Sequence, residues 1–438
     1  MKTIIVSAAA WADTQKRLQA STEESCAVFL TRPGATSDAI LVRTELSVPD
    51  DAYSKRSPVA AELKAAFLFD ATERARVEQS ALLFVHTHPQ TVGQPRFSNA
   101  DDAGEIKLKA YLDLKLPARA HASLILAPDG CCTRILGGED VSLKEVGSGV
   151  RFLCEPFQAD ETAYKQIFDR QVRAFGAAGQ RLIARTKVGL VGVGGTGSVA
   201  AQELAYLGVR KFVLIDDKVL DETNLNRVVS AMQADIGTPK VELCQRLIHR
   251  INDEAEVDAV LGTVLNPDCL ERLAGCDFIF LCTDNHASRL EVCHFCYRYL
   301  IPAIDMGVAI GTEQGRVSSV AGRIQMIAPD LPCLICTKSI SADEVRRETM
   351  SPEQRAADPY FSSAGEPQPS VISLNSTVSS LAVTMFVAAI TGLPIESRHL
   401  RYDALRSKVY PLAAQAHPTC LICSPGGELG AGREAASW

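Results

Sequence analysis

Apolar strands that alternate with helical segments constrain the fold of the C-terminal part of this chain more than any other feature. Four short segments are continuously apolar: "KVGLVGV", "KFVLID", "DAVLG" and "DFIFLCT". Such strands are typical of a parallel sheet covered by helices on both faces, because every side chain is then buried. The sequence therefore predicts an α/β domain with a mostly parallel, Rossmann-like sheet, and "VISLNSTVSSLAVTMFVAAITG" predicts a late buried helix.

The N-terminal part has a different, mixed pattern. Its start, "MKTIIVSAAAWADTQKR", predicts a strand leading into a helix, and "PVAAELKAAFLFDATERARVEQ" predicts a helix among short strands. A chain of 438 residues is also longer than a single core usually grows. We therefore expect an α+β domain at 1–140, a linker at 141–162, an α/β domain at 163–425 and a disordered tail at 426–438.

Composition excludes several partners. The net charge of -7 and the pI near 5.7 argue against nucleic acid, because backbone binding needs clustered Lys and Arg. No run of 18 apolar residues occurs, so we expect no membrane partner. Fourteen cysteines are scattered along the chain, and four form two CxxC pairs typical of zinc sites in reducing compartments. These features favour the cytoplasm.

A glycine-rich turn, "LVGVGGTGS", lies between a predicted strand and a predicted helix. Its glycines would let the backbone approach phosphates at the helix N-terminus, and Asp216 at the end of the next strand can bind a ribose hydroxyl. The four glycines are Gly192, Gly194, Gly195 and Gly197. Taken alone, this motif favours an NAD-dependent dehydrogenase.

Charged residues after the turn favour ATP instead. The segment "DETNLNR" supplies Asn224 and Arg227, "IGTPKVE" supplies Lys240, and "FLCTDNHASR" places Asp284 at the end of a strand. If a carboxylate attacks the α-phosphate of ATP, cations can stabilise the developing charge and Asp284 can hold Mg²⁺. Hydride transfer needs none of these groups. Each residue alone is more often an ordinary surface residue, but their spacing together favours adenylation.

From "FDRQVRAFGAAGQ" to the last "CLIC", the chain resembles the E1-like family of ThiF, MoeB and ubiquitin-activating enzymes. The resemblance implies that the glycines cradle ATP, that Asp216 binds ribose and that Asp284 holds Mg²⁺. It also implies that Asn224, Arg227 and Lys240 contact phosphates, and that Arg170 reaches into the partner protomer of a homodimer. Lys218 stands where the family often has a second acid, which leaves that contact open.

Two identical "CLIC" segments predict a closed structural zinc site with four thiolate ligands. The ligands would be Cys333, Cys336, Cys420 and Cys423. The alternative is four buried thiols without a metal. The segment "CHFC", with Cys293 and Cys296, lies in an apolar helix without a second pair, and we interpret it as core packing.

The segment "FVHTHPQTVGQPRFSNADD" predicts a second, catalytic zinc site. His86 and His88 lie two residues apart on a strand and so point to the same side. Asp101 is the natural third ligand, leaving one position for water. Glu24 is the expected proton carrier, with Glu23 as its competitor, and Ser98 can donate to a developing oxyanion. A histidine pair alone is more often structural.

Together, Glu24, "HTHP" and "SNAD" resemble the JAMM (JAB/MPN) metalloprotease family, whose members cleave ubiquitin or ubiquitin-like tails. In that family the glutamate is the general acid/base, the histidines and the aspartate bind zinc, and the serine helps polarise the carbonyl. The stretch from Pro89 to Ser98 is about two residues longer than the family pattern, which leaves its loop geometry open.

The sequence thus predicts a fused protein that resembles bacterial ubiquitin-like conjugation systems. One half would process a ubiquitin-like protein, and the other would adenylate its C-terminal glycine for an E2-like partner. The alternatives are activation of a sulfur-carrier protein, or an N-terminal half that only docks the modifier. Since Thr337 to Thr419 contains no cysteine, the acceptor would be an external nucleophile, Ser362 or Ser363, or a cysteine elsewhere.

Overall fold

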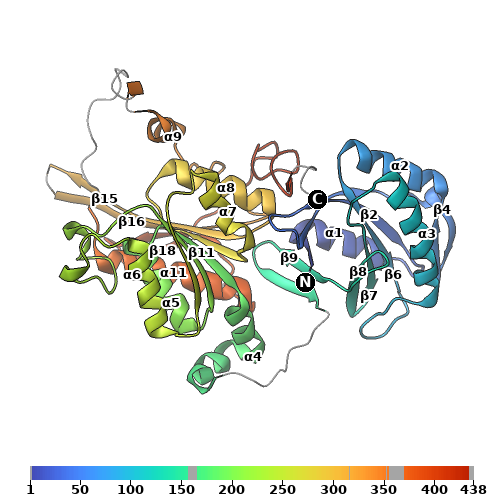
Figure 1. The fold of residues 1–438 in the computed structure, drawn as a ribbon, viewed down its shortest axis with the longest axis horizontal. Coiled ribbons are helices and arrows are strands. Elements are labelled where there is room, and N and C mark those ends of the chain that lie inside the picture. The colour runs from blue at the N-terminus through green and yellow to red at the C-terminus, as the bar shows by residue number, and fades with distance from the viewer. Residues whose placement is uncertain (1, 156–164, 315, 352, 355–368, 434–438) are drawn as a thin grey trace. The chain divides into compact units, whose positions relative to one another are not determined.

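The computed structural model contains two compact units (Figure 1). The described residues are 2–155, 165–314, 316–351, 353–354 and 369–433. The first unit comprises the described residues up to Glu155, the residues Arg298–Leu300 and the segment from Pro425. The second unit comprises the remaining described residues from Lys165 to Ser424. The protein thus has two domains, as the fold prediction expects.

The first unit is built on an eight-stranded mixed sheet in the order β10-β9-β1-β3-β2-β6-β7-β8. The strands are β1 Thr3–Ser7, β2 Cys26–Pro33, β3 Ala39–Leu46, β6 Ala81–Thr87, β7 Ala122–Ala127, β8 Gly130–Ile135, β9 Ser142–Val146 and β10 Val150–Cys154. A separate hairpin pairs β4 Tyr53–Ser57 with β5 Ala60–Leu63. The helices are α1 Ala8–Gln19, α2 Ala65–Val77 and α3 Asn99–Lys115. This is the expected α+β organisation.

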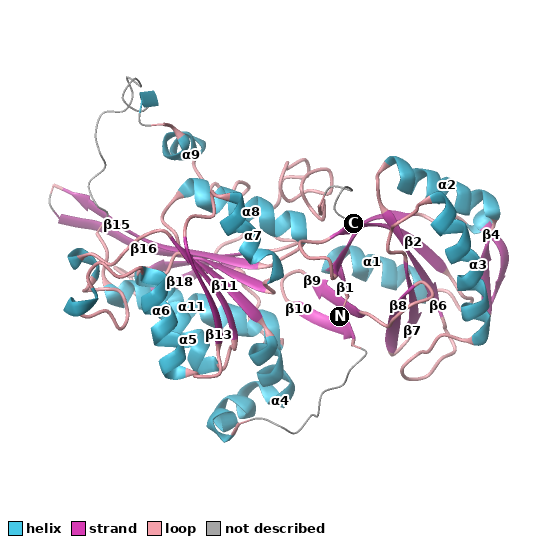
Figure 2. Ribbon diagram, viewed as in Figure 1, coloured by secondary structure: helices cyan, strands magenta, loops and turns pink. Residues whose placement is uncertain are grey.

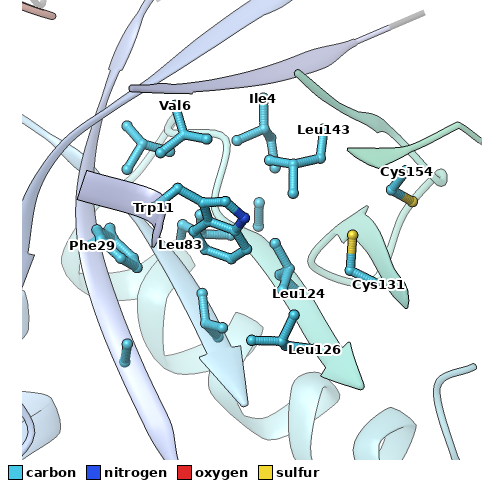
Figure 3. Packing of buried hydrophobic residues seen from close by; sticks show 14 of the residues in the cluster. Ile4, Val6, Trp11, Phe29, Leu83, Leu124, Leu126, Cys131, Leu143 and Cys154 are labelled. Carbon is cyan, nitrogen blue, oxygen red and sulfur yellow. The ribbon is translucent and has the colours of Figure 1, made fainter. Parts of the chain in front are cut away.

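Both faces of this sheet carry apolar side chains. On one face Trp11, Phe29, Leu83 and Leu124 pack together (Figure 3). On the other face a second cluster contains Val28, Leu30, Leu82 and Leu112. Because alternate side chains of a strand point to opposite faces, β2 and β6 are buried on both. Their burial explains why the sequence shows them as continuous apolar runs.

Three segments of the first unit differ from the sequence prediction. Residues 142–154, expected in a linker, form β9 and β10, and β9 pairs in parallel with β1. Lys144 and Glu145 obscured β9 in the sequence, yet both are buried in the structure. The first residues of the predicted long helix form β5 instead. The expected disordered tail is described as far as Arg433, whose Nη2 donates to the main-chain oxygen of Ala35 at 2.6 Å.

The second unit has an eight-stranded sheet in the order β13-β12-β11-β14-β15-β16-β17-β18. The strands are β11 Lys187–Val191, β12 Lys211–Asp216, β13 Glu256–Leu261, β14 Phe278–Leu281, β15 Ala303–Glu313, β16 Arg316–Ile327, β17 His399–Asp403 and β18 Lys408–Pro411. In this order, each strand from β13 across to β15 pairs in parallel with the next, as predicted, and each strand from β15 to β18 pairs antiparallel with the next.

Helices cover both faces of the second sheet (Figure 2). The helices are α4 Asp169–Arg185, α5 Gly195–Leu207, α6 Lys240–Ile251, α7 Pro267–Glu271, α8 His286–Tyr299, α9 Ala342–Thr349 and α11 Ile372–Thr391. On β15, Asp305 pairs with Arg289 of α8, whereas its neighbour Met306 contacts Ser379 of α11. Since neighbouring strand residues face opposite sides, α8 and α11 lie on opposite faces.

Helix α11 is the predicted late apolar helix. Among the described residues it is the one helix with the length and composition to cross a membrane, and 61% of its most apolar window is buried. It packs against α5, α4, β15 and β16. These contacts are those of a core helix.

Candidate functional site

The glycine-rich turn joins β11 to α5 and requires glycine at two positions, one because of its backbone conformation and one because of a close contact. Gly192 has φ +86°, which is in the left-handed region. A Cβ on Gly197 would lie 2.0 Å from the main-chain oxygen of Gly192. Gly194 caps α5 and has open space where a side chain would be. The bare helix N-terminus therefore offers backbone N–H donors and a positive dipole to an anion.

Asp216 lies beside this turn, at the carboxyl end of β12. Its Oδ2 accepts from the backbone N–H of Val193 at 2.8 Å, and its Oδ1 accepts from the N–H of Lys218 at 2.9 Å. A carboxylate has about four lone-pair sites, so both oxygens can still accept from a hydroxyl. The arrangement fits the predicted ribose contact.

Two buried polar residues approach the same end of the sheet. Asn224 is 3% exposed and its Oδ1 has no hydrogen-bond partner among the described residues, while Lys240 is 7% exposed. Burial lowers the pKa of the Lys240 ammonium, Asp216 opposes this, and Lys218 adds to it. A buried cation and an unpartnered amide oxygen indicate a site that is completed by a bound ligand.

Arg227 and Asp284 complete the set that the sequence predicted. The side chain of Arg227 lies against Gly195, where a Cβ would be 3.5 Å from its Cδ. Asp284 follows β14, is exposed, and lies 3.8 Å from the Nζ of Lys218. Because β11 lies between β12 and β14, Lys218 and Asp284 approach each other from the two sides of the turn.

Arg170 is the one predicted residue of this group that the structure places elsewhere. Its neighbour Phe168 packs on Gly208, and Gln171 donates to the main-chain oxygen of Tyr206 at 3.2 Å. Both contacts are at the C-terminal end of α5, a helix of 13 residues whose ends lie about 18 Å apart. Arg170 therefore lies far from the glycine turn of its own chain.

Cys282 lies beside the glycine turn. A Cβ on Gly197 would lie 3.2 Å from the Cys282 Cβ. Burial raises the pKa of the Cys282 thiol, which disfavours the nucleophilic thiolate. Ser362 and Ser363, the predicted hydroxyl acceptors, lie outside the described residues.

The four cysteines of the two "CLIC" segments form one cluster. The Sγ atoms of Cys333 and Cys420 are 3.6 Å apart, and those of Cys336 and Cys423 are 3.7 Å apart. Zn–S bonds near 2.3 Å in a tetrahedron require about 3.8 Å between sulfurs. The geometry fits one zinc ion. Cys293 and Cys296 are buried in α8, which agrees with core packing.

A second candidate metal centre lies in the first unit. His86 is the last residue but one of β6, and His88 follows the strand. The Nε2 of His86 lies 3.2 Å from the Nε2 of His88 and 3.1 Å from the Oδ1 of Asp101. Ligand atoms of a tetrahedral site with Zn–N bonds near 2.0 Å are about 3.3 Å apart. The three residues that the sequence predicted as ligands are therefore brought together with suitable spacing.

Ser98 orients Asp101 in this centre. It is the N-cap of α3, where its Oγ accepts from the Asp101 N–H at 3.2 Å and donates to Asp101 Oδ2 at 2.7 Å. Burial opposes ionisation of Asp101, but hydrogen bonds from His86 and Ser98 hold its pKa well below the usual range. The single hydroxyl proton of Ser98 is thus used by Asp101, and its predicted role toward an oxyanion stays a prediction.

Glu24, rather than Glu23, faces the histidines. Its Oε1 lies 3.9 Å from the Nε2 of His88 and its side chain is largely buried. Burial raises the pKa of Glu24, and the nearby His86 partly offsets this. Glu23 is half-exposed and approaches Arg56. Only Glu24 is therefore placed to exchange protons with a group at the centre.

Comparison with known proteins identifies the family of the second unit. Residues 168–422 match the ThiF family, more than half of the chain. The chain belongs to the ThiF family. Its second unit is accordingly an E1-like adenylyltransferase domain, which decides against the dehydrogenase that the glycine turn alone favoured. The residues before 168, which include the histidine centre, lie outside the ThiF match.

Several proteins are similar to this ThiF-family chain. The SAMP-activating enzyme E1 of Haloferax volcanii is 28% identical over 58% of this chain and 85% of its own length. The molybdopterin-synthase adenylyltransferase of Salmonella typhimurium is 26% identical over 58% of this chain and 95% of its own length. A solved structure of the microcin C7 biosynthetic enzyme MccB in complex with N-formylated MccA also matches, with 18% sequence identity and a TM-score of 0.49. This match covers 61% of the present chain and 77% of the MccB chain.

Two residues that the structure places at these sites were not predicted from the sequence. Asn375 of α11 lies against Gly195 of the glycine turn. Arg56 of β4 donates to the main chain of Glu24. Neither residue belongs to a recognisable motif, because each approaches its site from a segment distant in the sequence.

Proposed function

We propose that this protein activates a ubiquitin-like protein in its ThiF-family half and processes the same protein in its N-terminal half. In the N-terminal half, zinc-dependent cleavage would remove the modifier's tail or release its conjugates, as the resemblance to JAMM proteases implies. In the ThiF-family half, the C-terminal glycine exposed by tail cleavage would be adenylated with ATP. The observation that carries this proposal is the approach of Glu24 to within 3.9 Å of a three-ligand centre in a chain that also holds the glycine turn.

The ThiF-family half would join the glycine carboxylate to AMP. A carboxylate oxygen attacks the α-phosphorus, the bond to the β-phosphate breaks, and pyrophosphate leaves. The N-terminal N–H groups of α5 and the cations of Arg227 and Lys240 stabilise the negative charge. Asp216 holds the ribose, Asn224 contributes a neutral contact, and Asp284 holds Mg²⁺, which neutralises the phosphates.

The N-terminal half would hydrolyse a peptide or isopeptide bond. When bound by His86, His88 and Asp101, zinc lowers the pKa of a water molecule and polarises the carbonyl. Glu24 takes the water proton and delivers it to the leaving amine. Its raised pKa suits a carboxyl that holds a proton for part of the cycle. Ser98 keeps Asp101 in place.

The names of the relatives support two kinds of substrate. One relative is a SAMP-activating enzyme E1, and another is a molybdopterin-synthase adenylyltransferase. The latter favours a second candidate, in which the adenylate of a sulfur-carrier protein is converted to a thiocarboxylate. A third reading, an N-terminal half that only docks the modifier, would leave the histidine centre without metal.

The position of Arg170 supports a homodimer. Its neighbours contact the end of α5 opposite the glycine turn, and the two ends of that helix are about 18 Å apart, so Arg170 would serve the site of a second copy, as the family resemblance implies. Without a cysteine between Thr337 and Thr419, we infer direct transfer of the adenylate to an external nucleophile, with an E2-like protein as the partner. The ester at Ser362 or Ser363 ranks second, because a hydroxyl needs a positioned base.

A test separates the two activities. A ubiquitin-like protein ending in glycine and encoded beside this chain would serve as the adenylation substrate, and the same protein with a C-terminal extension would serve as the cleavage substrate. We expect Asp284→Ala to abolish ATP–pyrophosphate exchange and keep cleavage, and His88→Ala to do the reverse. Loss of both activities in each variant would contradict the division of labour.

A further inference from the structure

The first turn of α11 lies directly over the nucleotide turn. A Cβ on Gly195 would lie 2.3 Å from the Nδ2 of Asn375 and 3.3 Å from its Cγ. Asn375 itself is 3% exposed. Its side-chain amide is therefore packed against the first residue of α5, at the end of the helix where an anion is expected to bind.

Polar contacts fix α11 in this position. The Oγ of Ser379 donates to the main-chain oxygen of Thr196 at 2.9 Å, and the Oγ of Ser380 donates to Oε1 of Glu203 at 2.6 Å. Residues 375 and 379 are four apart and so lie on one helix face. Ser379 docks the helix on α5, and Asn375 is carried to Gly195 as a result.

The chemistry of Asn375 suits a phosphate contact. A carboxamide has two N–H donors, and one of them reaches the Oγ of Ser370 at 3.1 Å. Arg227 approaches Gly195 as well, with its Cδ 3.5 Å from the position of a Cβ. A neutral donor and a cation thus meet at the N-terminus of α5, which is also positive because of the helix dipole.

We propose that Asn375 is a further substrate-contacting residue of the adenylation site, and that its amide donates to an oxygen of the α-phosphate of ATP and of the adenylate. This inference rests on the ATP-dependent adenylation proposed above. The amide stabilises charge at the phosphorus under attack, next to the N–H groups of α5 and to Arg227.

The test measures equilibrium binding of Mg·ATP to the full chain by calorimetry, together with the melting temperature. Asn375→Asp has nearly the same shape but replaces the donor with a negative charge, and Asn375→Ala removes the donor. We expect ATP affinity to fall about tenfold in Asn375→Ala and further in Asn375→Asp. Thr384→Ala is the matched control, since it removes an exposed hydroxyl from the same helix and keeps the amide, and we expect it to bind ATP within about threefold of the parent.

The outcomes separate this inference from the proposed function. If the unaltered chain binds no Mg·ATP, the ATP-dependent function is wrong, and this inference with it. If the unaltered chain binds and both Asn375 variants bind equally well, Asn375 is only structural and the inference alone is overturned. A lower melting temperature in Asn375→Ala with normal affinity in Asn375→Asp would overturn it too.

Discussion

The Nε of Arg56 donates to the main-chain oxygen of Glu24 at 3.2 Å, which ties the β4–β5 hairpin to the residue that faces the histidine centre. The same guanidinium donates through Nη2 to the Oγ of Ser25 at 2.7 Å and lies over the ring of Tyr53 at 4.8 Å. In turn, the Tyr53 hydroxyl accepts from the N–H of Cys26 at 2.7 Å. The hairpin thereby holds three consecutive residues, two through the main chain and Ser25 through its hydroxyl.

Replacing Arg56 tests whether this anchoring serves catalysis. We expect Arg56→Ala to lower kcat for cleavage about tenfold, since the Glu24 carboxylate loses its fixed position, while KM and zinc content stay unchanged. Arg56→Lys should recover part of the rate because it keeps one donor. The control is Arg74→Ala, which removes an exposed pair with Glu78. Equal kcat in all three variants would refute the anchoring role.

Substitution by alanine should change stability by different amounts at two glycines of the nucleotide turn. In Gly197→Ala the new methyl group would meet the Gly192 oxygen at 2.0 Å, so we expect the free energy of unfolding of the second unit to fall by about 1–3 kcal/mol. Gly194→Ala places its methyl group in open space, and we expect a change below about 0.5 kcal/mol. Urea denaturation measures both. Similar losses in the two variants would show that the backbone geometry is not what requires glycine.

Zinc removal should affect the two units differently. Cys420→Ser removes one ligand of the four-cysteine cluster, and we expect loss of one zinc ion and a melting temperature of the second unit lowered by several degrees. His88→Ala should also lose one zinc ion, yet leave the melting temperature of the first unit nearly unchanged, since the capped start of α3 and the end of β6 hold the other two ligands. Elemental analysis and calorimetry provide the readouts. One zinc ion per unaltered chain, rather than two, would instead support the alternative in which the first unit only docks the modifier.

His121 should make the first unit sensitive to acid. Its Nδ1 accepts from the N–H of Leu82 at 3.1 Å, and burial lowers its pKa to about 4. Because the unfolded chain takes up a proton near pH 6.5 and the folded unit does not, stability is fully present above pH 6.5. It falls by up to about 1.4 kcal/mol per pH unit between pH 6.5 and 4.

The variant His121→Asn isolates this contribution. Asparagine can accept from Leu82 but does not titrate, so we expect a flatter dependence of the melting temperature on pH between 6.5 and 4. His249→Asn is the control, because His249 lies in the second unit. An unchanged slope in His121→Asn would show that other groups cause the acid sensitivity.

The sequence predicted the strand and helix pattern of the second unit well because its central strands are buried on both faces. It missed the β15–β16 hairpin, in which glycine and serine interrupt the apolar pattern. It also missed β9, since Lys144 and Glu145 are buried charges that resemble a linker. Charged residues are rarely buried, so a prediction based on polarity places them at the surface.

Local motifs predicted the site residues that come from one strand end or one turn. His86 and His88 are fixed by the two-residue repeat of a strand, and Asp101 follows from the start of α3. Asn375 and Arg56 depend on how distant segments pack, which no local pattern encodes. Arg170 was assigned to the partner's site by resemblance alone, and its distance from its own turn is a feature that only the folded chain reveals.

Trp11 lies in the middle of the first unit's core, beside Leu83 and Leu124 (Figure 3). The sequence contains one other tryptophan, Trp438, which lies outside the described residues. In a Trp438→Phe background, indole emission would therefore come from a single place. It would report the unfolding of the N-terminal unit separately, without any external dye or label.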